Sequence, residues 1–258
     1  MWNNYKVMNY FANMLFVMVA FAVLYIVSLQ VITPQVFPLK QISIKAIHGT
    51  HSGSGTLQQI TREQIELIVH NEISGNFFTV DLAAVRQAFM KLPWVRDMKI
   101  QRAWPHGLIV MLEEHTVLAR WGNDALVNTH GEVFHAVVDE KLPLFLGSME
   151  KNSQEVTQRY MRFNQLLAPL QQYIAEISVS PRHAWHIRLE TGTVLELGRN
   201  EVEARLARYA SVYNHSIAQL NQQEPLPYMD LRYPNGFAVR MPEATQQVLH
   251  KPGERGET

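Results

Sequence analysis

The chain has 258 residues, of which 23 are basic and 23 acidic, so its formal net charge is zero, and it contains no cysteine. A neutral chain sets up no overall field that attracts nucleic acid, so we predict no nucleic-acid partner. Without cysteine the chain forms neither disulfides nor thiolate metal sites, and any exported domain must be held together by packing.

The stretch from Val7 to Leu39 contains no Asp, Glu, Lys or Arg, and its centre is almost wholly apolar. A helix over Tyr10–Ile32 would be roughly 34 Å long, which is enough to cross a hydrocarbon layer of about 30 Å. Pro34 and Pro38 end that helix. We therefore predict a membrane helix at residues 10–32, after a short head at residues 1–9.

Two other interpretations of this stretch are less favoured. A cleaved signal peptide has a shorter apolar run with a small-x-small cleavage site after it, whereas the Ala-Phe-Ala triplet at residues 20–22 lies inside the run. A buried core helix has a polar face, and Phe11–Val27 offers none. Lysines flank the run on both sides, so charge does not decide the orientation. Because the head is so short, we expect it to stay in the cytoplasm while the rest of the chain is exported.

The region after the membrane helix is predicted to form one strand and then two short helices. Gln41–His48 alternates apolar and polar residues, as a strand does. Residues 49–55 are rich in Gly and Ser but lack the spacing of a phosphate-binding loop, so we predict a flexible loop. Thr61 and Gln64 form a capping-box pattern at the start of the first helix, and Asp81 caps the second.

A predicted hairpin completes this region. From Trp94 the period changes to two, and the turn sequence Pro-His-Gly at residues 105–107 precedes a returning strand at Leu108–Leu112. The order is strand, helix, helix, strand, strand. Neither the strands nor the helices can bury an apolar side alone, so the helices must cover one face of a three-stranded sheet in an α+β fold.

The following region is predicted to be a second, mostly antiparallel β domain with flanking helices. Short extended pieces separated by turn residues occur at Ala125–Val127, Val133–Phe134, Leu144–Leu146, Ile174–Val179, Trp185–Leu189 and Val194–Leu197. A polar helix is predicted at Ser153–Ala168, and a longer one opens with a capping-box pattern at Asn200 and Glu203. Tyr209 and Tyr213 continue the apolar stripe of the longer helix, so we interpret them as core residues rather than a ligand site.

A terminal hairpin is predicted from Tyr228–Tyr233 and Phe237–Met241, with a turn at residues 234–236. Residues 243–258 are polar and lack aromatic side chains, so we predict a disordered tail. The last strand is expected at the edge of its sheet, where Arg240 and the proline after the strand guard only its end. Such an edge can add a strand from a partner.

The side chains that would carry catalysis are not arranged for it. His183 and His186 are the nearest approach to a metal-ligand pair, but their spacing in an extended segment points them to opposite faces. Glu113 and Glu114 are adjacent on a strand and also point apart. No Gly-x-Ser-x-Gly motif occurs. We therefore expect no enzymatic activity, no metal and no cofactor.

One basic cluster could serve either as an interaction patch or as a solvated face. Its members are Arg86, Lys91, Arg96, Lys99 and Arg102. The apolar residues between them follow helix and strand periods, which favours the solvated face.

Several short motifs occur together along the chain. They are Leu92–Val95, Arg102–Pro105, Glu114–Trp121, Leu126–Asn128 with Gly131 and Phe134, Leu197–Arg199, and Asp230–Tyr233 with Gly236 and Val239. With the single anchor and the order strand, helix, helix, strand, strand, the chain resembles the FtsQ/DivIB family over nearly its whole length. Val117 is a departure, because the family often has Pro there.

The resemblance implies a POTRA domain at residues 39–115 and a β domain at residues 116–242. It implies a non-enzymatic scaffold of the inner membrane, with both domains in the periplasm at the division septum and without a small-molecule substrate. By the same resemblance, the β domain binds the division proteins FtsB and FtsL, and the POTRA domain binds upstream proteins such as FtsK.

The predicted partner-binding residues are Arg199, Tyr233, Gly236, Phe237, Val239 and Met241. The first three follow from the resemblance, Phe237 and Val239 from the edge-strand argument, and Met241 stands where the family can have Trp. A purely structural interpretation makes Tyr233 a hairpin-stabilising aromatic and Gly236 a turn residue with positive φ.

Two other functions stay open. A POTRA-bearing chaperone or secretion component would need a membrane barrel or a partner that supplies one, and no barrel-length series of strands occurs in the sequence. An anchored cell-wall hydrolase would need the catalytic groups that the sequence lacks.

Overall fold

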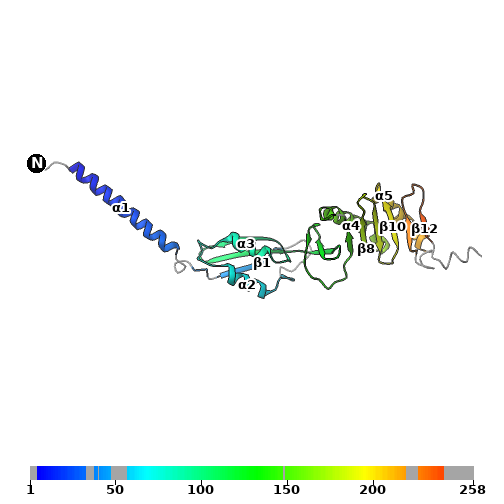
Figure 1. Ribbon diagram of the computed structural model, residues 1–258, viewed down its shortest axis with the longest axis horizontal. Helices are drawn as coiled ribbons and strands as arrows, with labels where there is room; N and C mark the ends of the chain where they lie inside the picture. Colours follow the sequence, from blue (N-terminus) through cyan, green and yellow to red (C-terminus); the bar gives the residue numbers. More distant parts are fainter. Residues whose placement is uncertain are drawn as a thin grey trace, which may run out of the picture. The chain divides into compact units, whose positions relative to one another are not determined.

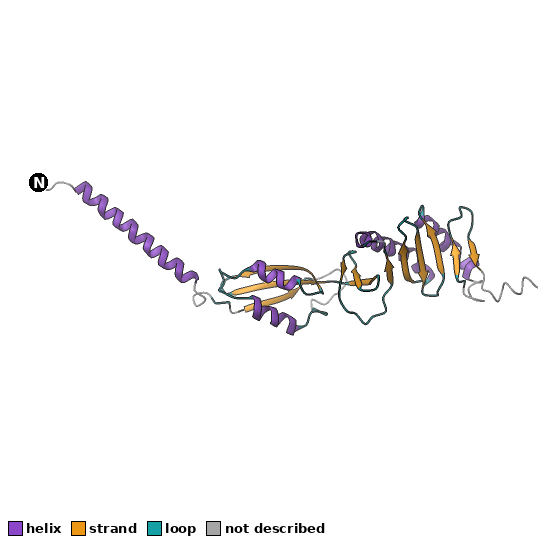
Figure 2. Cartoon of the chain, in the orientation of Figure 1, coloured by secondary structure: helices purple, strands orange, loops and turns teal. Residues whose placement is uncertain are grey.

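A computed structural model describes residues 5–32, 38–39, 41–47, 57–147, 149–218 and 226–240 of the chain (Figures 1 and 2). The chain divides into two compact units, Met1–His115 and Thr116–Thr258. The predicted loop at residues 49–55 and the predicted tail at residues 243–258 lie outside the described residues.

The first helix, α1, extends over Tyr5–Ile32. It begins five residues before the predicted start. The prediction placed the start where the apolar run begins. The preceding residues Tyr5–Asn9 contain neither Pro nor Gly, so they can extend the helix. The segment Val7–Leu29 has a mean hydropathy of 2.3 and none of it is buried. By length and composition α1 is therefore a candidate membrane span.

The remainder of the first unit contains a three-stranded sheet and two helices. The strands are β1 (Gln41–Ala46), β2 (Val95–Ala103) and β3 (Gly107–Glu114), and the helices are α2 (Arg62–Glu72) and α3 (Leu82–Met90). The strand order is β1-β3-β2, with β1 parallel to β3 and β2 antiparallel to it. The predicted order of strand, helix, helix, strand, strand is confirmed.

Both predicted helix caps in this unit are present. The Thr61 side chain accepts the backbone N–H of Gln64 while the Gln64 side chain accepts that of Thr61, which is a complete capping box. Asp81 accepts the N–H groups of Ala83 and Ala84 at the start of α3.

One face of the three-stranded sheet is buried beneath the two helices, as predicted. Alternate residues of β3, namely Leu108, Val110 and Leu112, are fully buried. They share one apolar cluster with the buried faces of α2 and α3, which include Ile65 and Phe89. The period of two along β3 therefore separates the core from the solvent side.

The adjacent glutamates at the end of β3 point apart, as predicted. The Glu114 carboxylate accepts the backbone N–H groups of Gln58, Gln59 and Ile60, at 2.8 to 2.9 Å, just before α2. The Glu113 carboxylate lies 2.6 Å from the Arg96 guanidinium. Each carboxylate therefore has a structural role within the first unit.

The arginines of the basic cluster are held by internal contacts. Arg86 lies 3.5 Å from Asp97, and Arg96 pairs with Glu113. Arg102 donates to the backbone carbonyls of the loop before α3. Arg86, Lys91, Lys99 and Arg102 are nevertheless exposed, as a solvated face requires, and only Arg96 is partly buried. The sequence could not show these pairings because the partners are distant along the chain.

The second unit is built on a nine-stranded sheet. Its strands are β4 (Val117–Trp121), β5 (Ala125–Asn128), β6 (Val133–Phe134), β7 (Leu144–Leu146), β8 (Ile174–Val179), β9 (Trp185–Leu189), β10 (Val194–Gly198), β11 (Tyr228–Asp230) and β12 (Ala238–Arg240). Their order is β12-β11-β10-β9-β8-β7-β4-β5-β6. Five of the eight strand pairs are antiparallel, so this sheet is mostly antiparallel, as predicted.

Two helices connect parallel neighbours of this sheet. Helix α4 (Ser153–Leu167) joins β7 to β8, and α5 (Val202–Val212) lies between β10 and β11. Short 3-10 segments at Glu150–Asn152 and Ala168–Leu170 flank α4, and α5 continues as a π-helical segment over Tyr213–Ile217. A parallel pair needs such a crossover connection.

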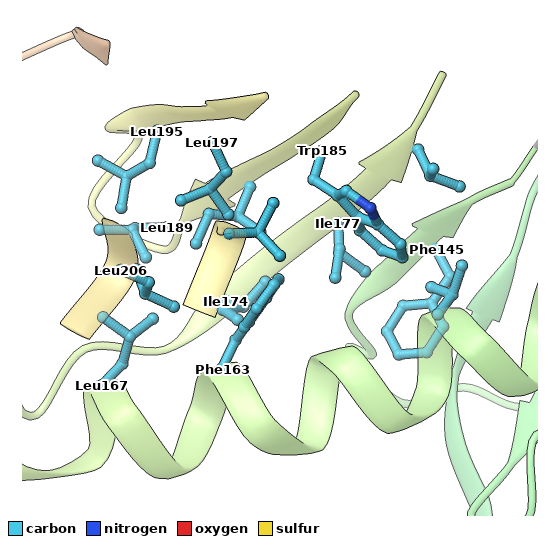
Figure 3. Close-up of a cluster of buried hydrophobic side chains, with 14 of the residues drawn as sticks. Phe145, Phe163, Leu167, Ile174, Ile177, Trp185, Leu189, Leu195, Leu197 and Leu206 are labelled. Carbon is cyan, nitrogen blue, oxygen red and sulfur yellow. The ribbon is translucent and has the colours of Figure 1, made fainter. Parts of the chain in front are cut away.

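The core of the second unit lies between these helices and the sheet. Phe163 and Leu167 project from α4 toward Ile174, Ile177 and Trp185, and Leu206 of α5 joins them (Figure 3). The rings of Phe163 and Trp185 meet edge to face, with centroids 6.3 Å apart. All these side chains are buried, so they contribute to the hydrophobic stabilisation of this unit.

The two tyrosines of the last helix are core residues, as predicted. Tyr209 is buried, its hydroxyl donates to the Gln172 side chain at 2.9 Å, and its burial raises the pKa of the phenol. Tyr213 is partly buried and its ring centroid lies 5.6 Å from that of Tyr209. Both therefore have a packing role.

The predicted capping box at Asn200 and Glu203 is wrong. Glu201 is the N-cap residue of α5, with a left-handed φ of 53° and no side-chain capping bond. The Glu203 carboxylate instead lies 3.6 Å from each of the guanidinium groups of Arg159 and Arg162 on α4. A tertiary ion-pair network has replaced the local cap, which local sequence could not indicate.

Candidate partner-binding surface

The predicted terminal hairpin is present, and its last strand is an edge of the nine-stranded sheet. β12 pairs antiparallel with β11 through Tyr228↔Arg240, Met229↔Val239 and Asp230↔Ala238. No described strand pairs with the other side of β12. An edge strand of this kind directs a row of backbone N–H and C=O groups away from the sheet, where a partner can bind them.

The turn between β11 and β12 is fastened to α5 by Arg208. Its guanidinium donates to the backbone carbonyls of Pro234, Tyr233 and Leu231, the last two at 3.1 and 3.5 Å. The same guanidinium lies 5.8 Å from the centre of the Phe237 ring. The sequence analysis missed Arg208, because an arginine on a helix carries no local sign that it reaches a distant turn.

A second arginine fixes the end of β11. The Arg232 side chain binds the Asp230 carboxylate through both Nε and Nη2, at 2.9 and 2.6 Å. These hydrogen bonds hold the pKa of Asp230 below its usual range, while the paired carboxylate raises the pKa of Arg232. At the other end of β11, the Tyr228 ring lies beneath the guanidinium of Arg240 on β12. Burial raises the pKa of the Tyr228 phenol.

Gly198 allows the side chains of Arg205 and Arg232 to pack closely at the end of β10. Its φ is +73°, and a Cβ at this position would lie 2.9 Å from the Arg205 Nη1 atom and 3.1 Å from the Arg232 side chain. Arg205 in turn donates to the Leu197 carbonyl at 2.6 Å. The structure therefore explains why the Leu-Gly-Arg motif has glycine at this position: the backbone has a positive φ, and there is no room for a side chain.

A shallow hollow of about 500 Å³ lies beside the edge strand. It is lined by Tyr233, Pro234, Asn235, Gly236, Phe237 and Ala238. The structure thus brings three of the predicted binding residues, Tyr233, Gly236 and Phe237, to one place. Tyr233 is 55% exposed although the hairpin is fastened to α5, so its ring is free to contact a partner.

The structural explanation of Gly236 is wrong. Its φ lies outside the positive range, and a Cβ built on it would meet nothing within 4 Å. Glycine is therefore not required there by the backbone or by the packing.

The predicted last strand begins one residue later than expected, so Phe237 lies just before it. The strand begins at Ala238, and Phe237 packs against the core beneath Arg208. Val239 lies in the strand and is exposed. Met241 lies outside the described residues.

Arg199 and Tyr233 lie at the same end of the sheet. β10 and β11 are parallel, and Arg199 directly follows β10 while Tyr233 lies three residues after β11, so both follow the carboxyl ends of neighbouring strands. Arg199 is exposed and has no ion pair with another described residue. A cation and an aromatic ring therefore lie at the same end of the sheet.

The two histidines considered as metal ligands are used differently. The His186 Nδ1 atom lies 2.6 Å from the Glu196 carboxylate on the adjacent strand. His183 has a left-handed φ of 58° in the preceding turn. Among the residues that the structure describes, no group of three or more His, Asp or Glu side chains could hold a metal ion.

Comparison with known proteins identifies both units. Residues 54–115 match the family described as "POTRA domain, FtsQ-type", and residues 119–232 match "Cell division protein FtsQ/DivIB, C-terminal". The chain belongs to the FtsQ/DivIB family. The three-stranded sheet with its helices is accordingly a POTRA domain, and the family assignment suggested by the motifs is confirmed.

Full-length relatives extend this result beyond the matched domains. The Cell division protein FtsQ of Nitrosospira multiformis is 44% identical over 240 residues, covering 93% of this chain and 99% of the relative. The Burkholderia pseudomallei protein of the same name is 36% identical, with 93% and 94% covered. That of Bordetella pertussis is 31% identical, with 99% and 100% covered. The chain therefore has the domain composition of an FtsQ-family cell-division protein.

Proposed function

We propose that this protein is a non-enzymatic scaffold of the division septum, anchored in the inner membrane by α1. Its amino terminus lies in the cytoplasm, and its POTRA and β domains lie in the periplasm. The β domain binds FtsB and FtsL, and the POTRA domain binds upstream division proteins such as FtsK. Confining these partners to one membrane assembly raises their effective concentration without bond chemistry.

The observation that supports this proposal most directly is the edge strand β12 beside its hollow. In this mode of recognition the partner adds an extended segment to the sheet, so that main-chain hydrogen bonds supply affinity and side-chain contacts supply specificity. The Tyr233 ring and the Arg199 guanidinium are exposed at one end of this surface, and β12 has no other strand against its outer side in the described chain.

The binding site can be tested by separating affinity from stability. We expect Tyr233→Ala and Arg199→Glu each to weaken binding of the periplasmic segment of FtsB by more than tenfold, which corresponds to about 1.4 kcal/mol. Because both side chains are exposed, the thermal unfolding midpoint should hardly change. Arg182→Glu, an exposed charge reversal in the turn between β8 and β9, is the matched control and should leave the affinity unchanged.

Two results would overturn this site assignment. Unchanged affinity in both variants would exclude the edge strand as the site. A loss of thermal stability that accounts for the loss of binding would return Tyr233 and Arg199 to a structural role.

The proposed orientation has its own test. A reporter that is active only in the periplasm, fused after Thr258, should be active in cells. Activity of a cytoplasm-only reporter at the same position would contradict the orientation, and depletion of the protein should give undivided filaments if the division role is correct.

A further inference from the structure

Two aromatic side chains of the POTRA domain are exposed on loops. Trp104, in the turn between β2 and β3, is 80% exposed, and Phe78, in the loop between α2 and α3, is 48% exposed. The neighbouring Phe77 is buried, and its ring meets that of Phe78 edge to face with centroids 5.1 Å apart. Exposed aromatic rings of this size are unfavourable in water, so a surface that covers them would be stabilising.

The Trp104 turn lies where β1 begins. Gln41, the first residue of β1, is opposite Gly107, and Gly107 is also opposite Ala103 across the hairpin. The three strands therefore share one end, which we call the turn end of the POTRA sheet. A hollow of about 340 Å³ lies there, lined in part by Gln41, Ser43 and Trp104.

The Phe78 loop lies at the same end. Pro38, three residues before β1, forms a β-bridge with Asn76. Arg102, two residues before Trp104, donates to the backbone carbonyls of Phe77 at 2.9 Å and Val80 at 3.2 Å. Two separate contacts therefore bring the loop between α2 and α3 to the turn end.

Covalent geometry places this end close to the end of α1. Pro38 follows Ile32, the last residue of α1, by six positions. At a maximum of about 3.6 Å per residue, six residues span at most roughly 22 Å. The opposite end of the sheet, where β2 begins at Val95, is roughly 26 Å further along that strand.

The composition of the two loops suits the interfacial layer of a membrane. Residues 74–80 and 104–106 contain Trp, Phe, Pro, His and small polar residues but no Asp, Glu, Lys or Arg. Asp81 and Arg102 flank them and are used as a helix cap and a carbonyl clamp. Aromatic residues are enriched at membrane–water interfaces, where the ring lies among the headgroups and its polar atom meets water.

We propose that the turn end of the POTRA sheet is a second membrane contact, in which Trp104 and Phe78 insert into the interfacial layer of the bilayer that α1 spans. This inference rests on the proposed role of α1 as a membrane anchor. The contact fixes the height and tilt of the POTRA domain over the membrane, and it leaves the other end of the sheet facing away from the lipid.

Quenching of tryptophan fluorescence by brominated phospholipids tests this contact. The full chain is reconstituted into vesicles with and without brominated lipid, and the quenched emission of the native chain is compared with that of Trp104→Phe. Subtraction isolates Trp104 from the other four tryptophans. We expect most of the Trp104 emission to be quenched.

Trp94 provides the matched control, because it lies in the same domain just before β2 and roughly 30 Å from Trp104 along that strand. The emission removed by Trp94→Phe should not be quenched. In the Trp104→Phe background, Phe78→Trp should restore a quenched component, which tests the second loop independently of the first.

Flotation of the vesicles separates this inference from the proposed anchor. A chain that does not float with the vesicles contradicts the anchor itself. A chain that floats while Trp104 is quenched no more than Trp94 overturns the second contact alone. Quenching of Trp94 as strong as that of Trp104 would also overturn it, because the domain would then have no preferred end toward the lipid.

Discussion

The edge strands of the two sheets differ in how they meet the solvent. β2, at one edge of the POTRA sheet, has nine residues and a register shift between Val95 and Asp97. Arg96, the extra residue of that bulge, pairs with Glu113, and Asp97 pairs with Arg86. Bulges and charged side chains are the devices by which proteins prevent an edge from pairing with another chain.

β12, at one edge of the β domain, is fixed from behind and open in front. Arg208 holds its hairpin against α5, Arg232 binds Asp230 at the end of β11, and the hollow next to Tyr233 faces solvent. The comparison indicates that an edge suited to a partner combines a rigid hairpin with few guarding charges, since the only charged residue of β12, Arg240, lies at its end. β2 has a bulge and charged side chains that prevent pairing, whereas β12 has a hairpin that is held in place by Arg208.

The largest expected effect comes from loosening the anchorage behind β12. Gly198→Ala should lower the free energy of unfolding of the β domain by about 2 to 3 kcal/mol, since it combines a strained φ with a clash against Arg205 and Arg232. Gly192→Ala is the matched control, with a φ of +93° but nothing within 4 Å of its Cβ. It should cost only about 1 kcal/mol. Chemical unfolding of the full chain in detergent measures both, and equal losses would show that the arginine packing contributes nothing.

A smaller effect is expected from the Asp230–Arg232 pair, and it should depend on pH. Asp230→Asn should lower the free energy of unfolding by about 1 to 2 kcal/mol at neutral pH. The pKa of Asp230 is lower in the folded than in the unfolded state, so its contribution is complete above the unfolded value of about 3.9 and is lost as the pH falls through the folded value. The difference between native and variant chains should therefore shrink only below about pH 4. A difference that stays constant to lower pH would contradict this role.

The ion pair between Arg96 and Glu113 on β2 is expected to contribute less to stability than the pair between Asp230 and Arg232. A double-mutant cycle with Arg96→Ala and Glu113→Ala should give a coupling energy of about 0.5 to 1 kcal/mol, as is usual for a partly exposed cross-strand ion pair. The exposed pair Arg62 and Glu66 in α2 is the control and should give a smaller value. Light scattering would measure self-association of the Arg96→Ala variant. Self-association would show that the ion pair prevents β2 from pairing with another chain.

The smallest effect on stability is expected at Gly236. Since its φ is not positive and its Cβ direction is open, Gly236→Ala should change the free energy of unfolding by less than about 0.5 kcal/mol. A bulkier Gly236→Leu should be tolerated in the same way but should occupy the hollow and weaken the proposed binding of FtsB. A marked loss of stability in the alanine variant would restore the structural explanation of this glycine.

Local sequence patterns predicted the elements well where the controlling contacts are short in sequence. The capping box of Thr61 and the cap of Asp81 formed as expected, and the strands Ile174–Val179 and Trp185–Leu189 have the predicted bounds. The same kind of pattern failed at Asn200 and Glu203, because Glu203 is drawn to Arg159 and Arg162 on another helix. A local cap is worth only about 1 kcal/mol, so the packing of the whole unit can override it.

The candidate site was predicted only in part, for the same reason. The sequence indicated a terminal hairpin and an edge strand, and Tyr233 and Gly236 line the hollow there. It did not indicate that Phe237 packs inward, nor that Arg208 reaches from α5 to the turn. Both facts depend on how a helix lies against a hairpin some 20 to 30 residues later in the chain.

The sequence by itself determined the apolar helix α1, the two helix caps and the alternation of β3, because hydrophobic period, caps and turns act over a few residues. Only the tertiary structure decided the order of the nine strands, the pairing of the arginines and the exposure of Trp104 and Tyr233. These depend on which distant surfaces meet, and the free energies of those contacts are set by burial and geometry rather than by neighbouring residues.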